Sequence, residues 1–134
     1  RVVILEGDIY RVGHVTLWDD PATLDFRSYQ KGEELLDGIA EQWDVSRLAW
    51  FTKGFYRASE LNDQIVISDL RMGYEESYAF NFAVANKLPS GVLEAIKAVP
   101  VKDERDLKKL AMLWHRLWDA SVSLHPFLDT NHKE

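Results

Sequence analysis

The chain has 134 residues, of which 46% are hydrophobic and 28% charged, and this composition is typical of one globular domain with a sizeable core. It contains no cysteine, which excludes a disulfide framework, thiolate zinc sites and a cysteine nucleophile. The net charge of −6 argues against a nucleic-acid backbone or an anionic lipid as the main partner, because both attract a basic surface.

The first residues are predicted to form a β-hairpin. Residues 2–5 are apolar, residues 6–8 (Glu-Gly-Asp) supply turn chemistry, and residues 9–18 return as a strand rich in β-branched and aromatic side chains. Residues 19–21 (Asp-Asp-Pro) end that strand, because proline cannot continue a ladder of hydrogen bonds. Residues 22–30 have no clean period and are left without a predicted element.

The middle of the chain predicts one helix followed by three strands. Apolar residues recur at helical spacing over 31–45, with charged residues between them. The next three segments, 48–58, 64–71 and 77–86, are predicted as strands, and the alternation in the third places its large side chains on one face. Gly73 is expected to supply the turn before the third strand.

Two further helices are predicted near the end of the chain. A short apolar helix covers 91–99, and a longer helix over 103–118 carries a single apolar stripe after an acidic first turn. The fold class predicted from these elements is α+β: a mostly antiparallel sheet of about five strands, in the order ββ-α-βββ-α-α, with helices packed on it. Residues 1–120 are expected to form one domain, and 121–134 a loosely ordered tail.

The C-terminal residues contain one candidate metal site. His125, Asp129 and His132 have spacing that brings three ligands to one face of a helix, but Pro126 and the terminal position argue against an ordered site. We therefore expect no metal and no other cofactor in this domain. The sequence also lacks the G-x-S-x-G motif of serine hydrolases and the glycine and lysine pattern of a phosphate loop.

The segment "SDLRMG" contains the best candidate for a functional site. Asp69 and Arg71 are two residues apart, so in a strand they share one face and can form a bidentate pair. One interpretation is a structural clamp that fixes the register of the sheet. The other is an anion-binding or substrate-binding Arg71, oriented by Asp69 and joined by Lys53 from the neighbouring strand. From residue types alone the structural interpretation is favoured.

Three motifs in order support a family resemblance. Trp50, Phe51, Gly54 and Phe55 match a W-F-x-x-G-F segment, residues 69–73 match D-L-R-[MF]-G, and Trp114, Arg116, Leu117 and Trp118 match W-x-R-[IL]-W. With the opening strand pair, this set resembles the soluble C-terminal region of the YdjM-like inner-membrane metal-dependent hydrolases of bacteria, also called LexA-binding inner-membrane-associated hydrolases. The resemblance implies structural roles for Trp50, Phe51, Gly54, Gly73, Trp114, Arg116 and Trp118.

The resemblance also implies where the domain belongs. The chain begins with Arg rather than Met, and we expect it to be a piece of a longer, inner-membrane-associated protein. The divalent metal of the family would lie in the membrane-embedded N-terminal part, which would be the main partner of this soluble domain, on the cytoplasmic side. A LexA-like protein partner follows from the family name only. The domain is then structural or partner-docking, and inactive when isolated.

Two alternatives to this docking role stay open. In the first, the domain completes the hydrolase active site by binding an anionic substrate group through Arg71. In the second, it binds a ligand by itself, which needs an apolar pocket lined by Trp50, Tyr78 and Trp114. The surroundings of Asp69 and Arg71 are expected to decide whether the first alternative holds.

Overall fold

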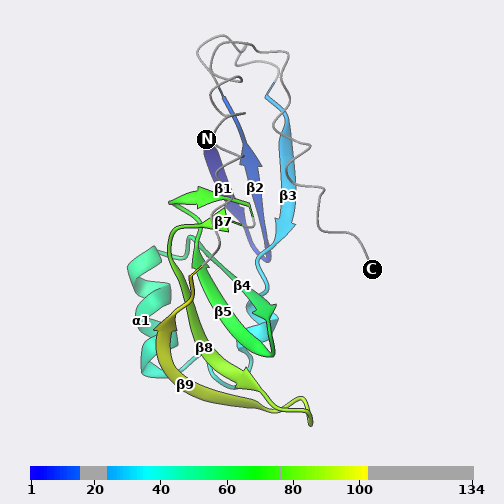
Figure 1. Cartoon of the computed structure of the whole chain (residues 1–134). Helices are drawn as coiled ribbons and strands as arrows, with labels where there is room; N and C mark the ends of the chain where they lie inside the picture. Colours follow the sequence, from blue (N-terminus) through cyan, green and yellow to red (C-terminus); the bar gives the residue numbers. More distant parts are fainter. Residues whose placement is uncertain (16–23, 76, 103–134) are drawn as a thin grey trace.

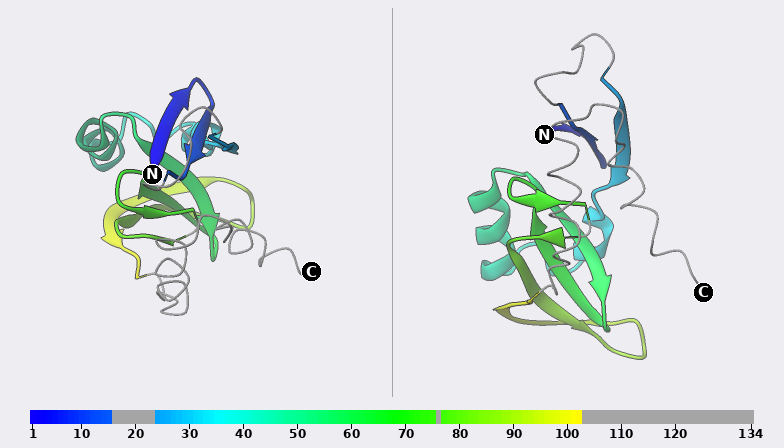
Figure 2. Two further views of the ribbon diagram at one scale, coloured as in Figure 1. Left: turned by 90° about the horizontal axis from the view of Figure 1, so that it is seen from above. Right: turned by 45° about the horizontal axis from the view of Figure 1, so that its top comes forward.

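The computed structural model describes residues 1–15, 24–75 and 77–102, and these form three antiparallel sheets and one α-helix. A three-stranded sheet lies above a four-stranded sheet, and a two-strand hairpin lies between them (Figure 1). Helix α1 (Trp43–Thr52) runs along one side of the four-stranded sheet in all views (Figures 1 and 2).

The upper sheet contains the predicted hairpin and one strand that was not predicted. Its strands are β1 (Val2–Glu6), β2 (Ile9–Gly13) and β3 (Phe26–Gln30), in the order β1-β2-β3. Strand β2 ends at Gly13, so residues 14 and 15 of the predicted second strand are not part of it, and residues 16–18 lie outside the described residues. Strand β3 was missed because it is an edge strand of sequence FRSYQ, in which polar residues obscure the period of two.

The lower sheet is built around two central strands. It has the order β4 (Tyr56–Leu61), β5 (Gln64–Asp69), β8 (Asn81–Lys87) and β9 (Leu93–Pro100). The turn between β4 and β5 places both Asn62 and Asp63 at positive φ, 50° and 58°, as a two-residue hairpin turn requires.

A small hairpin interrupts the strand that was predicted at 77–86. Strand β6 (Gly73–Tyr74) pairs with β7 (Ser77–Tyr78), and the long strand β8 starts only at Asn81. Gly73 has a φ of 131°, and a Cβ atom at this position would lie 2.5 Å from the carbonyl oxygen of Ser77. Only glycine permits this close approach, so the predicted turn role of Gly73 is consistent with the hairpin.

The helix predicted at 31–45 is wrong in its position. A 3-10 turn, η2 (Glu33–Leu36), is followed by turns, and α1 begins only at Trp43. Gly38 takes a φ of 83°, a left-handed conformation that ends helical structure there. The strand predicted from 48 is helical up to Thr52, because Leu48, Ala49 and Thr52 lie on one helical face that packs toward the core or is buried.

The predicted α+β fold class is also wrong. Within the described residues the chain is mostly antiparallel β, with one α-helix and three sheets instead of ββ-α-βββ-α-α. The segment predicted as a helix at 91–99 lies almost entirely in β9, which pairs with β8. A short apolar run does not distinguish a helix from a strand by its period. The helix predicted at 103–118 and the tail at 121–134 lie outside the described residues.

Two apolar clusters hold the sheets and helix together. The larger one lies between the four-stranded sheet and the helical segments; its buried residues are Leu36, Ile39, Val45, Tyr56, Ala58, Ile65, Ile67, Val84 and Ala85. The smaller one joins the upper sheet to the end of β5 and to β7; its buried residues are Tyr10, Val12, Leu70 and Tyr78. Burial of these side chains is the main stabilising contribution of the fold.

Candidate functional site

Helix α1 carries apolar residues on two opposite faces. The inner face is formed by Val45, Leu48, Ala49 and Thr52, which pack toward the sheet or are buried. The hydroxyl of Thr52 donates to the carbonyl of Leu48 at 2.9 Å, so its burial leaves no polar group unsatisfied. The carboxylate of Asp44 accepts a hydrogen bond from the backbone N–H of Ala98 at 2.7 Å and ties the helix to β9.

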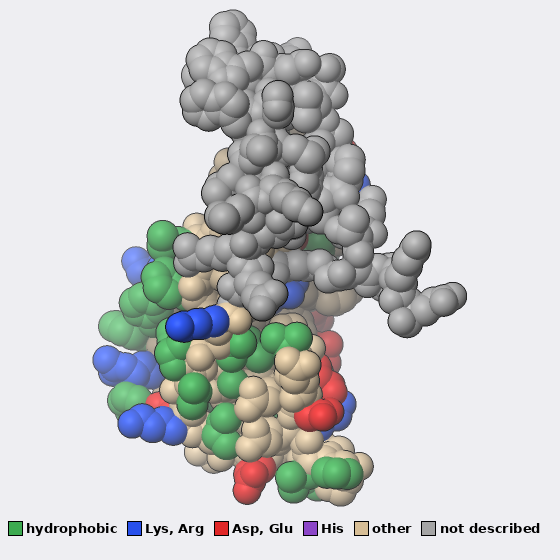
Figure 3. Space-filling model, viewed as in Figure 1, with side chains coloured by type: hydrophobic (Ala, Val, Ile, Leu, Met, Phe, Trp, Pro, Cys, Tyr) green, Lys and Arg blue, Asp and Glu red, His purple; other side chains and the backbone are tan. Residues whose placement is uncertain are grey.

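The outer face of α1 consists of aromatic and basic side chains. Trp43, Arg47 and Trp50 are spaced i, i+4 and i+7 and therefore share one side of the helix, with Phe51 beside them. The exposed fractions are 67% for Trp43, 75% for Trp50 and 55% for Phe51. The guanidinium of Arg47 lies 5.0 Å from the ring centroid of Trp43. Figure 3 shows hydrophobic and basic side chains alternating along the left edge, where α1 lies.

The predicted Asp69–Arg71 pair is present, and it lies in a turn. The Nε of Arg71 donates to Oδ1 of Asp69 at 2.9 Å, and Nη2 donates to Oδ2 at 2.6 Å. The backbone N–H of Arg71 donates to the same Oδ1 at 2.9 Å. Because β5 ends at Asp69, the pair closes the turn that leaves the strand and does not lie on one strand face. The hydrogen bonds from the guanidinium raise the pKa of Arg71.

Arg71 connects this turn to the outer face of α1. Its guanidinium lies 5.1 Å from the ring centroid of Phe51. The side chain of Arg71 is 37% exposed, whereas that of Asp69 is 5% exposed. Lys53 follows the helix in the left-handed conformation, with a φ of 54°, and is also exposed. The structure therefore brings Phe51, Asp69 and Arg71 together, and places Lys53 at the end of the same helix rather than on a strand.

We call Trp43, Arg47, Trp50, Phe51 and Arg71 the aromatic–basic surface. Sequence reasoning named three of its members, Trp50, Phe51 and Arg71, and missed Trp43 and Arg47. The signal that would have found them is the spacing of Trp43, Arg47 and Trp50, once the segment is treated as a helix. Trp114, Arg116 and Trp118 lie outside the described residues.

The chemistry of this surface favours contact over catalysis. The carboxylate of Asp69 already accepts from two N–H groups of the Arg71 guanidinium, so the pair carries no net charge and attracts an anion less than a free arginine does. The two tryptophans and Phe51 offer apolar area that is open to solvent. Exposed aromatic residues beside arginine are the residue types enriched where proteins bind other surfaces.

A second polar cluster is buried between the upper sheet and the β6–β7 hairpin. Glu75 is 2% exposed, and its Oε1 accepts from Nη2 of Arg1 at 2.7 Å and from the hydroxyl of Tyr78 at 3.1 Å. The hydroxyls of Tyr78 and Tyr10 lie 3.4 Å apart, and Tyr10 stacks on Tyr29 with the ring centroids 5.3 Å apart. We call this group the tyrosine cluster.

Arginine side chains also lie over an aromatic ring in the tyrosine cluster. The guanidinium carbons of Arg57 and Arg1 lie 5.4 and 5.8 Å from the ring centroid of Tyr78. Burial raises the pKa of the Tyr78 phenol, and the charge of Glu75 raises it further. Sequence reasoning did not single out this cluster, because Glu75 reads as a solvated turn residue. Its contacts join three elements, which is a structural role.

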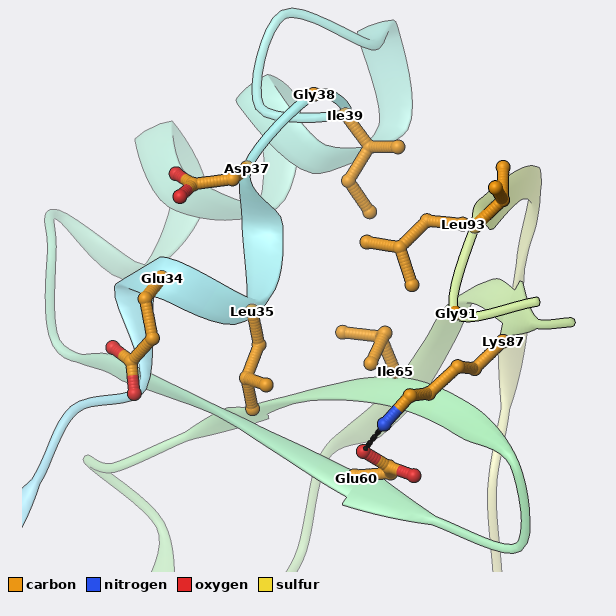
Figure 4. Close-up of a pocket in the computed structure, with 11 residues that line it drawn as sticks. Glu34, Leu35, Asp37, Gly38, Ile39, Glu60, Ile65, Lys87, Gly91 and Leu93 are labelled. Atoms are coloured by element: carbon orange, nitrogen blue, oxygen red, sulfur yellow. Dashed lines mark hydrogen bonds and ion pairs between the residues drawn. The ribbon is translucent and has the colours of Figure 1, made fainter. Parts of the chain in front are cut away.

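One cleft among the described residues has a lining that differs from the apolar pocket expected around Trp50, Tyr78 and Trp114. It has a volume of about 490 Å³ and lies between η2, β5 and the loop before β9. Leu35, Ile39, Ile65 and Leu93 point into it, and the ion pair of Lys87 with Glu60, at 2.6 Å, lies at its margin (Figure 4). Trp50 and Tyr78 do not line it, and Trp114 is outside the described residues.

Comparisons with protein-family models, curated proteins and solved structures find no match to this chain. The family resemblance therefore stays a prediction, and the function has to be argued from the geometry.

Two absences concern the described part of the chain. Within residues 1–15, 24–75 and 77–102, no group of three His, Cys, Asp or Glu side chains is placed to hold a metal ion. The considered ligands His125, Asp129 and His132 lie outside these ranges. No helix in the described part of the chain has the length and apolar character needed to cross a membrane.

Proposed function

We propose that this chain is a docking domain that is not catalytic by itself, and that it docks through the aromatic–basic surface of α1. The observation that carries the proposal is the second apolar face of the helix. A surface helix usually has one apolar face, which it buries against its own domain. Here Trp43, Trp50 and Phe51 stay exposed although the inner face is already packed.

The family resemblance supplies the larger protein for this proposal. The domain would be the soluble part of an inner-membrane-associated metal-dependent hydrolase, on the cytoplasmic side, with the metal held by the membrane-embedded part. In support, two of the three motifs meet in space, because Arg71 of D-L-R-[MF]-G lies over Phe51 of W-F-x-x-G-F. Contact between residues far apart in sequence fits a shared role at one surface.

The proposal is tested by photo-crosslinking in living bacteria. A benzophenone amino acid replaces Trp50 in the full natural protein, and in a matched control it replaces Leu61. Leu61 is 48% exposed and lies in the β4–β5 hairpin. We expect a discrete crosslinked product, to lipid or to protein, from position 50 and little from position 61. Equal or absent crosslinking at both positions would overturn the docking role.

A second candidate function is that Arg71 completes the hydrolase active site by binding an anionic substrate group. The observation that favours it is the partial exposure of the Arg71 side chain, 37%, while the buried carboxylate of Asp69 holds its orientation. It is tested with Arg71→Ala and Arg71→Lys in the full natural protein, assayed against phosphate esters. A hundredfold loss, an order expected for a positioned cation, with crosslinking intact would favour this candidate. Unchanged activity in a folded variant removes the domain from the chemistry.

A further inference from the structure

We propose that the aromatic–basic surface lies against a membrane surface that contains anionic lipids. This rests on the proposed docking function and names the partner of the same surface.

The first argument is the type and arrangement of the aromatic residues. Tryptophan and phenylalanine are the residues that amphipathic helices insert at the boundary between headgroups and acyl chains. Trp43 and Trp50 are seven residues apart and Phe51 follows, so all three project from one side of a ten-residue helix. At 67%, 75% and 55% exposed, they can enter such a boundary without any change in the fold.

The second argument is the local charge. The whole chain carries −6, yet the segment from Trp43 to Lys53 contains two cations, Arg47 and Lys53, and one acid. That acid is Asp44, whose carboxylate is held by the backbone N–H of Ala98. Arg71 adds a guanidinium that is balanced by Asp69. The segment that carries most of the aromatic–basic surface is thus net cationic on an acidic protein, which is complementary to anionic headgroups.

The third argument concerns the shape of the surface. A helix side is convex, whereas a protein partner for an aromatic side chain usually offers a pocket. A lipid surface needs no matching pocket. The guanidinium of Arg47 lies over the ring of Trp43, and a flexible arginine beside an inserted ring can keep its charge among the headgroups. Few cations give weak, reversible binding, which is sufficient for a domain tethered to a membrane protein.

The test uses flotation of the 134-residue chain with two kinds of lipid vesicle. One is phosphatidylcholine alone, and the other is phosphatidylcholine mixed with phosphatidylglycerol. We expect binding to the mixed vesicles to be stronger by roughly tenfold or more, since each basic residue near an anionic surface contributes about fivefold. Added salt should reduce this difference, because it screens exposed charges.

Matched variants assign the binding to α1. The double variant Trp50→Ser with Phe51→Ser should lose about tenfold in affinity for the mixed vesicles, and Arg47→Gln about fivefold. The control for the first is Leu61→Ser, and the control for the second is Arg11→Gln, in an exposed ion pair of the upper sheet. Both controls should bind within about twofold of the unchanged chain. Circular dichroism checks that each variant is folded.

The outcomes separate this inference from the docking function. Absence of vesicle binding, with position 50 still crosslinking to a protein, would overturn the lipid partner and keep the docking role. Vesicle binding that the α1 variants do not change would also overturn the lipid proposal. If sedimentation shows a dimer that only the α1 variants dissociate, the partner is a second copy and the lipid proposal is wrong. Failure of both crosslinking and flotation would overturn both proposals.

Discussion

The tyrosine cluster and the aromatic–basic surface both pair arginine with aromatic rings, but the first is buried and the second is exposed. In both, guanidinium groups lie over aromatic rings at similar distances, 5.4 and 5.8 Å for Tyr78, 5.0 Å for Trp43 and 5.1 Å for Phe51. Tyr78 is 4% exposed, whereas Trp50 on the outer face of α1 is 75% exposed. Folding therefore removes a much larger fraction of Tyr78 from water than of Trp43, Trp50 or Phe51.

This difference in burial separates the aromatic residues that stabilise the fold from those that do not. A cation over a desolvated ring stabilises more than a cation over an exposed one, and the ring itself contributes mainly through its buried area. The residues of the tyrosine cluster have a structural role, because they join the upper sheet to the β6–β7 hairpin. The fold does not explain the exposed residues of the aromatic–basic surface, and we explain them by a contact with a partner outside the chain.

The largest expected effect comes from emptying the tyrosine cluster. Tyr78→Ala should lower the free energy of unfolding by about 3–5 kcal/mol, because it removes a buried ring between two sheets. Urea denaturation measures the loss. Tyr78→Phe, the matched control, keeps the ring and loses only the hydroxyl contacts, which costs about 0.5–1.5 kcal/mol. A loss below about 1 kcal/mol for Tyr78→Ala would show that the cluster does not hold the sheets together.

The carboxylate of the same cluster gives a smaller effect. Glu75→Ala leaves the hydroxyl of Tyr78 and the guanidinium of Arg1 without their acceptor, and should cost about 1–3 kcal/mol of unfolding free energy. Glu75→Gln keeps an acceptor oxygen in place and should cost less. Equal losses for the two variants, measured in urea, would argue that packing and not hydrogen bonding holds Glu75.

Alkaline pH should lower the stability of the folded state through its buried tyrosines. Burial raises the pKa of Tyr56 to about 12, and raises the pKa of Tyr29 and of Tyr78 above the usual value of 10.0. These groups favour the folded state fully below pH 10, the unfolded pKa, and this contribution is lost as pH rises toward the folded values. The urea midpoint should fall as pH rises past about 10. A constant midpoint, with absorbance showing free ionisation, would contradict the buried placement.

The Asp69–Arg71 turn should respond asymmetrically to substitution. Asp69→Ala should cost about 1–2 kcal/mol, because the buried carboxylate also accepts the backbone N–H of Arg71. Arg71→Ala removes a partly exposed cation and should cost about 0–1 kcal/mol. The measurement is again the urea midpoint. A larger loss for Arg71→Ala than for Asp69→Ala would mean that the guanidinium, not the turn, is the structural element.

The sequence predicts strands correctly where turn residues separate them. Asn62 and Asp63 are residue types that favour turns, and both take positive φ in the turn between β4 and β5. Sequence reasoning failed on the segments around α1 and β9, because short apolar runs fit both a helix and a strand until their neighbours are known. In the folded chain, Ile65 and Ile67 on one side of β5 pack in the same core cluster as Val45 of α1.

The candidate site was predictable in part for the same reason. The pairing of Asp69 with Arg71 follows from their types and spacing, and the structure contains it. Its link to Phe51 could not be predicted, because the sequence predicts a strand over residues 48–58, which would place Trp50 and Phe51 on opposite faces. Only the helical geometry of α1 gathers Trp43, Arg47 and Trp50 on one side.

The most direct measurement of the central claim is the unfolding free energy of a Trp43→Ser, Trp50→Ser double variant. If the outer face of α1 serves contact and not the fold, the loss should be below about 1 kcal/mol, since exposed substitutions cost little. The same urea experiment on Tyr78→Ala provides the scale. A loss above about 3 kcal/mol for the double variant would show that the two tryptophans are part of the fold, and would contradict the account.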